Sequence, residues 1–105
     1  MKLEEIPEVL KNPTADGHLL AEAIGLATAE YAYISGFLQD ILSRKAAKWN
    51  ELRKDVASDT RADRIWDGTK DGIDEQGYKL KLKVLEKSIS SLKTILKIRE
   101  NERFN

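Results

Sequence analysis

Two groups of basic residues have a spacing that could support chemistry. Lys79, Lys83 and Lys87 are four residues apart, so in a helix they form one ridge. The second group lies earlier in the chain and consists of Arg44, Lys45 and Lys48. Such ridges can follow the phosphates of a nucleic acid without reading its sequence. These six residues are the candidate nucleic-acid-binding site. The alternative is that they serve solubility and ion pairing beside the apolar seam.

No catalytic constellation accompanies these basic residues. The sequence has a single histidine, His18, and no cysteine, so His clusters, disulfides, thiolate chemistry and Cys-based zinc sites are excluded. Ser88, Ser90 and Ser91 have no base at a spacing that would activate a hydroxyl. We expect a protein that is not an enzyme and needs no cofactor.

One acidic segment partly resembles a calcium-binding loop. Asp67, Asp71 and Gly72 match positions one, five and six of an EF-hand loop. The twelfth position, which should be a bidentate Glu, is Tyr78. We therefore expect an acidic turn and no metal site.

The spacing of apolar residues predicts the long helices that would position the basic ridges. Within residues 78–99, apolar positions recur at spacings of 4, 3, 4, 3 and 4, which predicts an amphipathic helix. The apolar seam of this helix comprises Tyr78, Leu82, Leu85, Ile89, Leu92 and Leu96. Residues 16–56 predict one long helix, started by a Thr14 or Asp16 cap, with a seam that includes Leu20, Ile24, Ala27, Tyr31, Ile34, Leu38 and Ile41.

Two segments break the helical pattern. Asn12-Pro13 separates residues 1–13 from the first long helix. Residues 1–13 are either a docking arm or a frayed end. Residues 57–77 form a turn or kink region. Ser58, Asp59 and Thr60 favour reversal at 57–59 followed by a helix start, whereas the glycines of 67–77 favour reversal there.

A face of small residues lies inside the first long helix. Gly25, Ala29, Ala32 and Gly36 recur at helical spacing. They indicate either close helix packing or a seam for self-association. Together with Leu82, Leu85, Ile89 and Leu92, they are the candidate packing and oligomer residues.

Charge is unevenly distributed although the net charge is zero. Residues 1–42 carry two basic and seven acidic residues, and residues 43–64 carry seven basic and four acidic ones. Residues 65–78 have a net charge of −3, and residues 79–105 of +5.

The sequence predicts one all-α domain. It is an antiparallel helical hairpin or coiled coil that has a short N-terminal arm and self-associates.

The location expected from the sequence is the cytoplasm. No apolar run approaches the ~20 residues of a membrane span. The first ten residues, MKLEEIPEVL, are too acidic for a signal peptide.

The chain resembles small helical proteins that phages encode beside recombination genes, including the recombination mediators of T-even phages. The resemblance covers the opening MKLEEIPEVLKN, the general helical layout and the pattern LKVLEKSISSLKTIL near the end. It implies an oligomer that binds single-stranded DNA through basic residues, with a recombinase or annealing protein as partner. The location would then be the host cytoplasm.

The resulting hypothesis is a non-enzymatic accessory protein of phage DNA recombination or replication. A second hypothesis is a phage-encoded inhibitor of a host defence enzyme that uses the acidic residues Glu22, Glu30 and Asp40. A third hypothesis is a small secreted helical hairpin, because Trp66-Asp67-Gly68 fits the W-x-G signature of such proteins. Trp66 and Ile65 would otherwise pack against the other helical arm.

Overall fold

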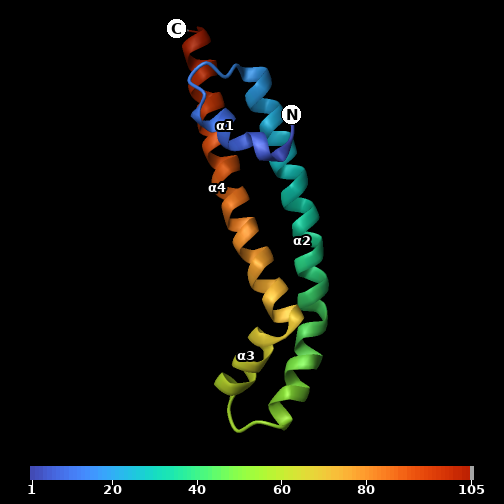
Figure 1. Ribbon diagram of the computed structural model, residues 1–105. Helices are drawn as coiled ribbons and strands as arrows, with labels where there is room; N and C mark the ends of the chain where they lie inside the picture. Colours follow the sequence, from blue (N-terminus) through green and yellow to red (C-terminus); the bar gives the residue numbers. More distant parts are fainter. Residues whose placement is uncertain (105) are drawn as a thin grey trace. The chain divides into compact units, whose positions relative to one another are not determined.

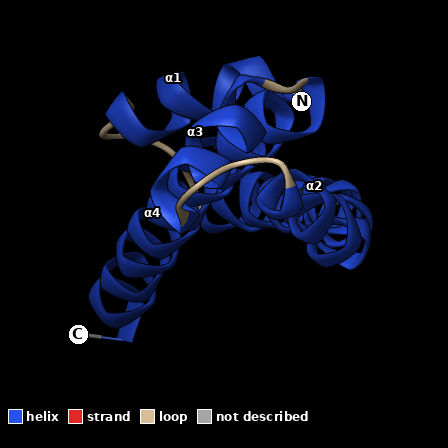
Figure 2. Ribbon diagram, turned by 90° about the horizontal axis from the view of Figure 1, so that it is seen from below, coloured by secondary structure: helices blue, strands red, loops and turns tan. Residues whose placement is uncertain are grey.

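The computed structural model describes residues 1–104, and within this range the chain is helical apart from short loops (Figure 2). A 3-10 turn, η1 (Leu3–Glu5), leads into α1 (Ile6–Lys11). The helices that follow are α2 (Gly17–Lys54), α3 (Asp59–Gly68) and α4 (Lys70–Phe104). The long helices α2 and α4 pack antiparallel (Figure 1), which confirms the predicted all-α hairpin.

The chain divides into two compact units. Unit 1 combines Met1–Ala32 with the part of α4 that begins at Lys83, and unit 2 is Tyr33–Leu82.

In unit 1, polar side chains set the beginning of α2. The Asp16 carboxylate accepts a hydrogen bond from the Leu19 N–H at 2.8 Å, so Asp16 is the N-cap. Asn12 has an extended backbone, as expected of a residue before proline, and it separates α1 from α2.

The core of unit 1 joins α1, α2 and α4. Its buried residues are Ile6, Val9, Ala15, Leu20, Ala23, Ala27 and Leu92. Leu20 and Leu92 are fully buried, and burial of each stabilises the fold by ~1.5–3 kcal/mol. Polar contacts also hold the arm: Arg99 donates to the carbonyl oxygens of Pro13 and Ala15. Residues 1–13 are therefore a docked arm.

In unit 2 the chain reverses between Lys54 and Asp59. Ser58 caps α3 by accepting a hydrogen bond from the Arg61 N–H at 3.2 Å, which confirms the predicted helix start. The segment 57–77, predicted as a turn or kink region, instead contains α3 and the first two turns of α4. Gly72 and Gly77 lie inside α4, and neither has the positive φ with which a glycine commonly ends a helix.

A tight corner at Thr69 joins α3 to α4. The Thr69 hydroxyl donates to the Trp66 carbonyl at 2.6 Å and accepts from the Gly72 N–H at 3.1 Å. A Cβ atom at Gly72 would lie only 1.9 Å from the Trp66 carbonyl oxygen. Glycine is therefore required where the end of α3 crosses the start of α4.

The core of unit 2 contains Ile34 and Ile41 of α2 with Ala62 and Trp66 of α3. Trp66 is almost fully buried, as the sequence predicts, whereas Ile65 is exposed. Residues one apart on a helix point in different directions, so α3 buries only one of the two.

Replacing Gly72 by Ala should destabilise the protein by roughly 1–3 kcal/mol, because the new methyl group overlaps backbone that cannot move freely. Urea unfolding measures the change. Gly36→Ala is the matched control, since a Cβ there meets no atom within 4 Å. That variant should be more stable than the wild type by up to ~1 kcal/mol. Equal effects of the two substitutions would contradict the corner geometry.

Candidate functional site: basic residues of α2 and α4

Four of the six candidate nucleic-acid-binding residues form ion pairs within unit 2. The Arg44 and Lys48 side chains bind Asp71, at 2.9 and 2.7 Å. Lys45 and Lys79 bind the second carboxylate, Glu75. Two helices supply these cations, and α4 supplies both carboxylates.

Glu75 is the buried member of this group, with a side chain only 6% exposed. Its carboxylate lies 2.9 Å from the Lys45 ammonium and 2.8 Å from that of Lys79, and it accepts a hydrogen bond from Trp66 Nε1 at 3.2 Å. The Lys45 ammonium also lies 5.5 Å from the centre of the Trp66 ring, which permits a cation–π interaction. We call Glu75, Trp66, Lys45 and Lys79 the Glu75 cluster.

Asp71 is held by a bidentate contact. Arg44 donates from Nε at 3.0 Å and from Nη2 at 2.9 Å, one to each carboxylate oxygen. Lys48 donates to the same carboxylate at 2.7 Å. The planar guanidinium fits a carboxylate in this way, which fixes the register between α2 and α4 in unit 2.

These contacts favour the ionised form of both acids. Hydrogen bonds from Arg44 and then Lys48 hold the pKa of Asp71 well below its usual range, and the bond to Asp71 raises the pKa of Arg44. Burial acts to raise the pKa of Glu75, but hydrogen bonds from Lys79, Lys45 and Trp66 outweigh it. The pKa of Glu75 is therefore also lowered.

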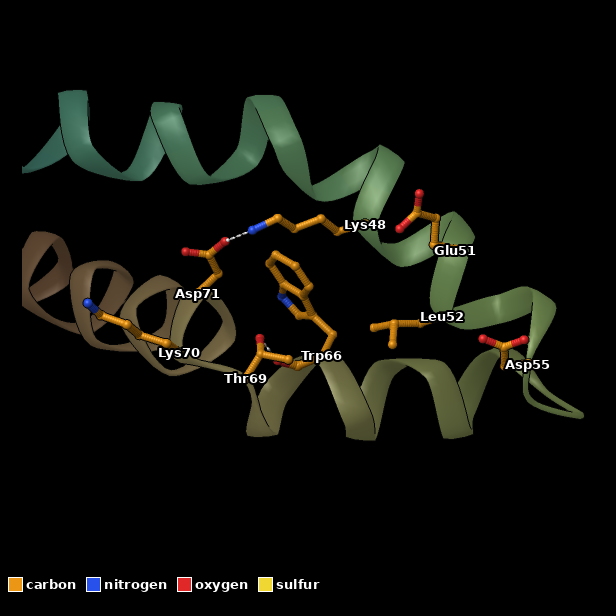
Figure 3. Close-up of a pocket in the computed structure, with 8 residues that line it drawn as sticks. All are labelled: Lys48, Glu51, Leu52, Asp55, Trp66, Thr69, Lys70 and Asp71. Atoms are coloured by element: carbon orange, nitrogen blue, oxygen red, sulfur yellow. Dashed lines mark hydrogen bonds and ion pairs between the residues drawn. The ribbon is translucent and has the colours of Figure 1, made fainter.

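A pocket of about 540 Å³ lies beside these ion pairs (Figure 3). Its walls are Lys48, Glu51, Leu52, Asp55, Trp66, Thr69, Lys70 and Asp71. The Thr69 hydroxyl donates to the Trp66 carbonyl, so no base activates it as a nucleophile. Because the pocket carries both signs of charge, it does not extend a basic surface.

Unit 1 contains a different set of lysines, on the outer side of α4. Lys83 and Lys87 are exposed, and Lys93 and Lys97 continue the same side of the helix within roughly one third of its circumference at 100° per residue. Among the described residues, no carboxylate lies within ion-pair distance of any of the four. We call these four residues the lysine face.

The candidate packing residues fall in two classes. Gly25, Ala29, Ala32 and Gly36 are exposed, so self-association through them stays a prediction. The α4 residues lie on the inner side of the helix: Leu82, Leu85 and Ile89 are half-buried and Leu92 is fully buried.

In the partial calcium loop, the carboxylate of Asp71 contacts cationic side chains. Asp71 is occupied by Arg44 and Lys48, and no group of three potential metal ligands is found over the described part of the chain.

Sequence reasoning missed Asp71 and Glu75 as the partners of the basic residues. Two signals were available. Residues 43–64 and 65–78 carry opposite net charges of +3 and −3, which favours pairing of the two segments. Glu75 also precedes Lys79 by four residues, the favourable order for an ion pair on a helix.

Replacing Glu75 by Ala should destabilise the protein by ~1–3 kcal/mol, because the buried Trp66 N–H loses its acceptor. Urea unfolding followed by tryptophan fluorescence measures the loss. Asp74→Ala serves as control, since no hydrogen bond or ion pair of the described residues involves that carboxylate. Its effect should stay within ~0.5 kcal/mol. A cost no larger than the control's would count against the Glu75 cluster.

Acid should weaken the fold through the same two carboxyls. Both have folded-state pKa values below their ordinary values of 3.8 for Asp71 and 4.5 for Glu75, so they stabilise the protein above those values. This stability should be lost as pH falls below about 4. Urea midpoints measured from neutral to acid pH test this, and the double variant Asp71→Asn, Glu75→Gln should show a flatter profile. An unchanged profile would rule out this origin.

Comparison with known proteins adds no functional assignment. No protein family matches the chain, and neither the curated proteins nor the solved structures give a match. Within the described residues, no helix is long and apolar enough to cross a membrane.

Proposed function

We propose that this protein is a non-enzymatic accessory protein that binds nucleic acid through the lysine face of α4. The observation that carries the proposal is that Lys83, Lys87, Lys93 and Lys97 share one side of a helix and pair with no carboxylate of the residues that the structure describes. Between residues 83 and 97 the sequence contains a single acidic residue, Glu86. Free ammonium groups on a rigid helix suit a polyanion, because binding displaces its counterions.

The spacing of the lysines also supports this proposal. Lys83 and Lys87, like Lys93 and Lys97, are one helical turn apart, or about 6 Å at 1.5 Å per residue. Such a row can contact successive phosphates without contacting bases. The sequence resemblance adds the context of phage DNA recombination or replication, with single-stranded DNA as the ligand and a recombinase or annealing protein as partner.

The proposed site keeps Lys83 and Lys87 of the six residues expected from the sequence and adds Lys93 and Lys97. Arg44, Lys45, Lys48 and Lys79 form ion pairs with Asp71 and Glu75, and the two carboxylates cancel half of the positive charge of these four residues. The alternative of an acidic inhibitor draws less support, because Glu22 pairs with the N-terminal ammonium at 3.2 Å.

Fluorescence anisotropy with a labelled single-stranded oligonucleotide, titrated with salt, tests the proposal. Each lysine that neutralises a phosphate should contribute about −0.7 to the slope of log K against log salt. The double variant Lys83→Ala, Lys87→Ala should bind more weakly and reduce the magnitude of the slope by about 1.4.

The charge-matched control is the double variant Lys2→Ala, Lys54→Ala, which removes two exposed lysines outside the lysine face. It should leave most of the affinity intact. Absence of binding even at low salt would refute the function. Equal losses in the two double variants would refute the site.

A further inference from the structure

A second pocket, of about 510 Å³, lies on α3 in unit 2. Its walls are Ser58, Thr60, Arg61, Arg64 and Ile65. Among the described residues these walls supply two cations, two hydroxyl groups and one apolar side chain, and no carboxylate. The pocket therefore differs from the one beside Asp71, whose walls carry both signs of charge. We call it the α3 pocket.

The two arginines of the α3 pocket lie on one side of the helix. Arg61 and Arg64 are both exposed, and their spacing of three residues separates them by roughly 60° around the helix axis. The buried residues of α3, Ala62 and Trp66, face the other way. Over the described part of the chain, neither guanidinium lies within ion-pair distance of a carboxylate.

The carboxylates of α3 do not offset these arginines. Asp59 and Asp63 each bind a side chain of α2, at 2.7 and 2.8 Å. Asp67 follows Arg64 by three residues, but it is not a wall of the pocket, and within the described range no ion pair joins the two. The α3 pocket thus presents positive charge to solvent.

The polar groups around the α3 pocket are donors. Each guanidinium offers a planar fork of N–H groups. The Ser58 oxygen accepts the Arg61 N–H at 3.2 Å, so its hydroxyl hydrogen stays available to donate, and Thr60 supplies a second hydroxyl. A phosphate group suits this set, because it carries more acceptor oxygens than a carboxylate and binds guanidinium forks well.

The α3 pocket also has room for more than a phosphate. Its volume falls within the range of about 300–1,000 Å³ that is usual for small-molecule sites. Ile65, which is 39% exposed, provides an apolar wall beside the arginines. Apolar surface and the plane of a guanidinium both suit the face of an aromatic base.

We infer that the α3 pocket binds a nucleotide. Arg61, Arg64 and the two hydroxyl groups hold its phosphate, and Ile65 contacts its base. A free nucleotide and the phosphorylated 5′ end of a single strand share this chemistry. The inference does not depend on the lysine face, because that face belongs to unit 1.

Calorimetric titration of the full chain with adenosine 5′-monophosphate at low salt tests the inference. Adenosine, which lacks the phosphate, should bind more weakly by about tenfold or more. The double variant Arg61→Ala, Arg64→Ala should lose affinity for the monophosphate to a similar extent, because charge-assisted hydrogen bonds to the phosphate are removed. Thr60→Val, which removes a donor and keeps the shape of the side chain, should also weaken binding and serves if the double variant does not fold.

Two control variants separate this site from the rest of the charge on the chain. Lys2→Ala, Lys11→Ala removes two exposed cations of unit 1, and Lys83→Ala, Lys87→Ala removes half of the lysine face. Both should bind the monophosphate as the wild type does. Failure of the lysine face as a nucleic-acid site would leave this result unchanged, so the two proposals can fail separately.

An oligonucleotide with and without a 5′ phosphate distinguishes the two sources. A preference for the phosphorylated strand that disappears in the double arginine variant identifies a strand end as the ligand. Binding of the monophosphate without that preference identifies a free nucleotide. The inference is overturned if the monophosphate does not bind, if adenosine binds equally well, or if the double arginine variant keeps the wild-type affinity.

Discussion

The carboxylate of Glu75 is the constraint on which unit 2 depends. A buried carboxylate is costly unless it is paired and hydrogen-bonded, and its partners here come from three helices: Lys45 of α2, Trp66 of α3 and Lys79 of α4 itself. These contacts hold α3 against the hairpin and fix which turn of α2 faces which turn of α4. The glycine at 72 follows from the same arrangement, since α3 can reach the cluster only by crossing α4 closely.

This constraint also determines which charges remain for function. The basic residues of α2 that look most suited to phosphate are used to neutralise Asp71 and Glu75, because a cation beside a poorly solvated carboxylate stabilises the fold. Within the described part of the chain, no carboxylate pairs with the lysine face of α4 in this way. The proposed nucleic-acid contacts therefore lie in unit 1, whereas the ion pairs of Asp71 and Glu75 lie in unit 2.

Much of the fold could be predicted because local rules act on neighbouring residues. The inner residues of α4, such as Leu85 and Leu92, follow from their spacing, and the caps at Asp16 and Ser58 follow from side chains that can accept a backbone hydrogen bond. The start of α4 was predicted eight residues too late, at 78 instead of 70. The sequence predicts turns at Gly72 and Gly77, whereas both lie inside α4, and at Gly72 close packing against Trp66 requires glycine.

The sequence by itself determined the helical class, the two apolar seams and the absence of Cys-based chemistry, because periodicity and composition are properties of the chain alone. Only the tertiary structure decided which of the basic residues pair with carboxylates. An ion pair such as Lys45 with Glu75 joins residues thirty positions apart, and no local spacing specifies it. Likewise, the small residues from Gly25 to Gly36 were candidates for packing, but the hairpin buries the opposite side of α2 and leaves them exposed. A helix has several faces, and long-range packing chooses among them.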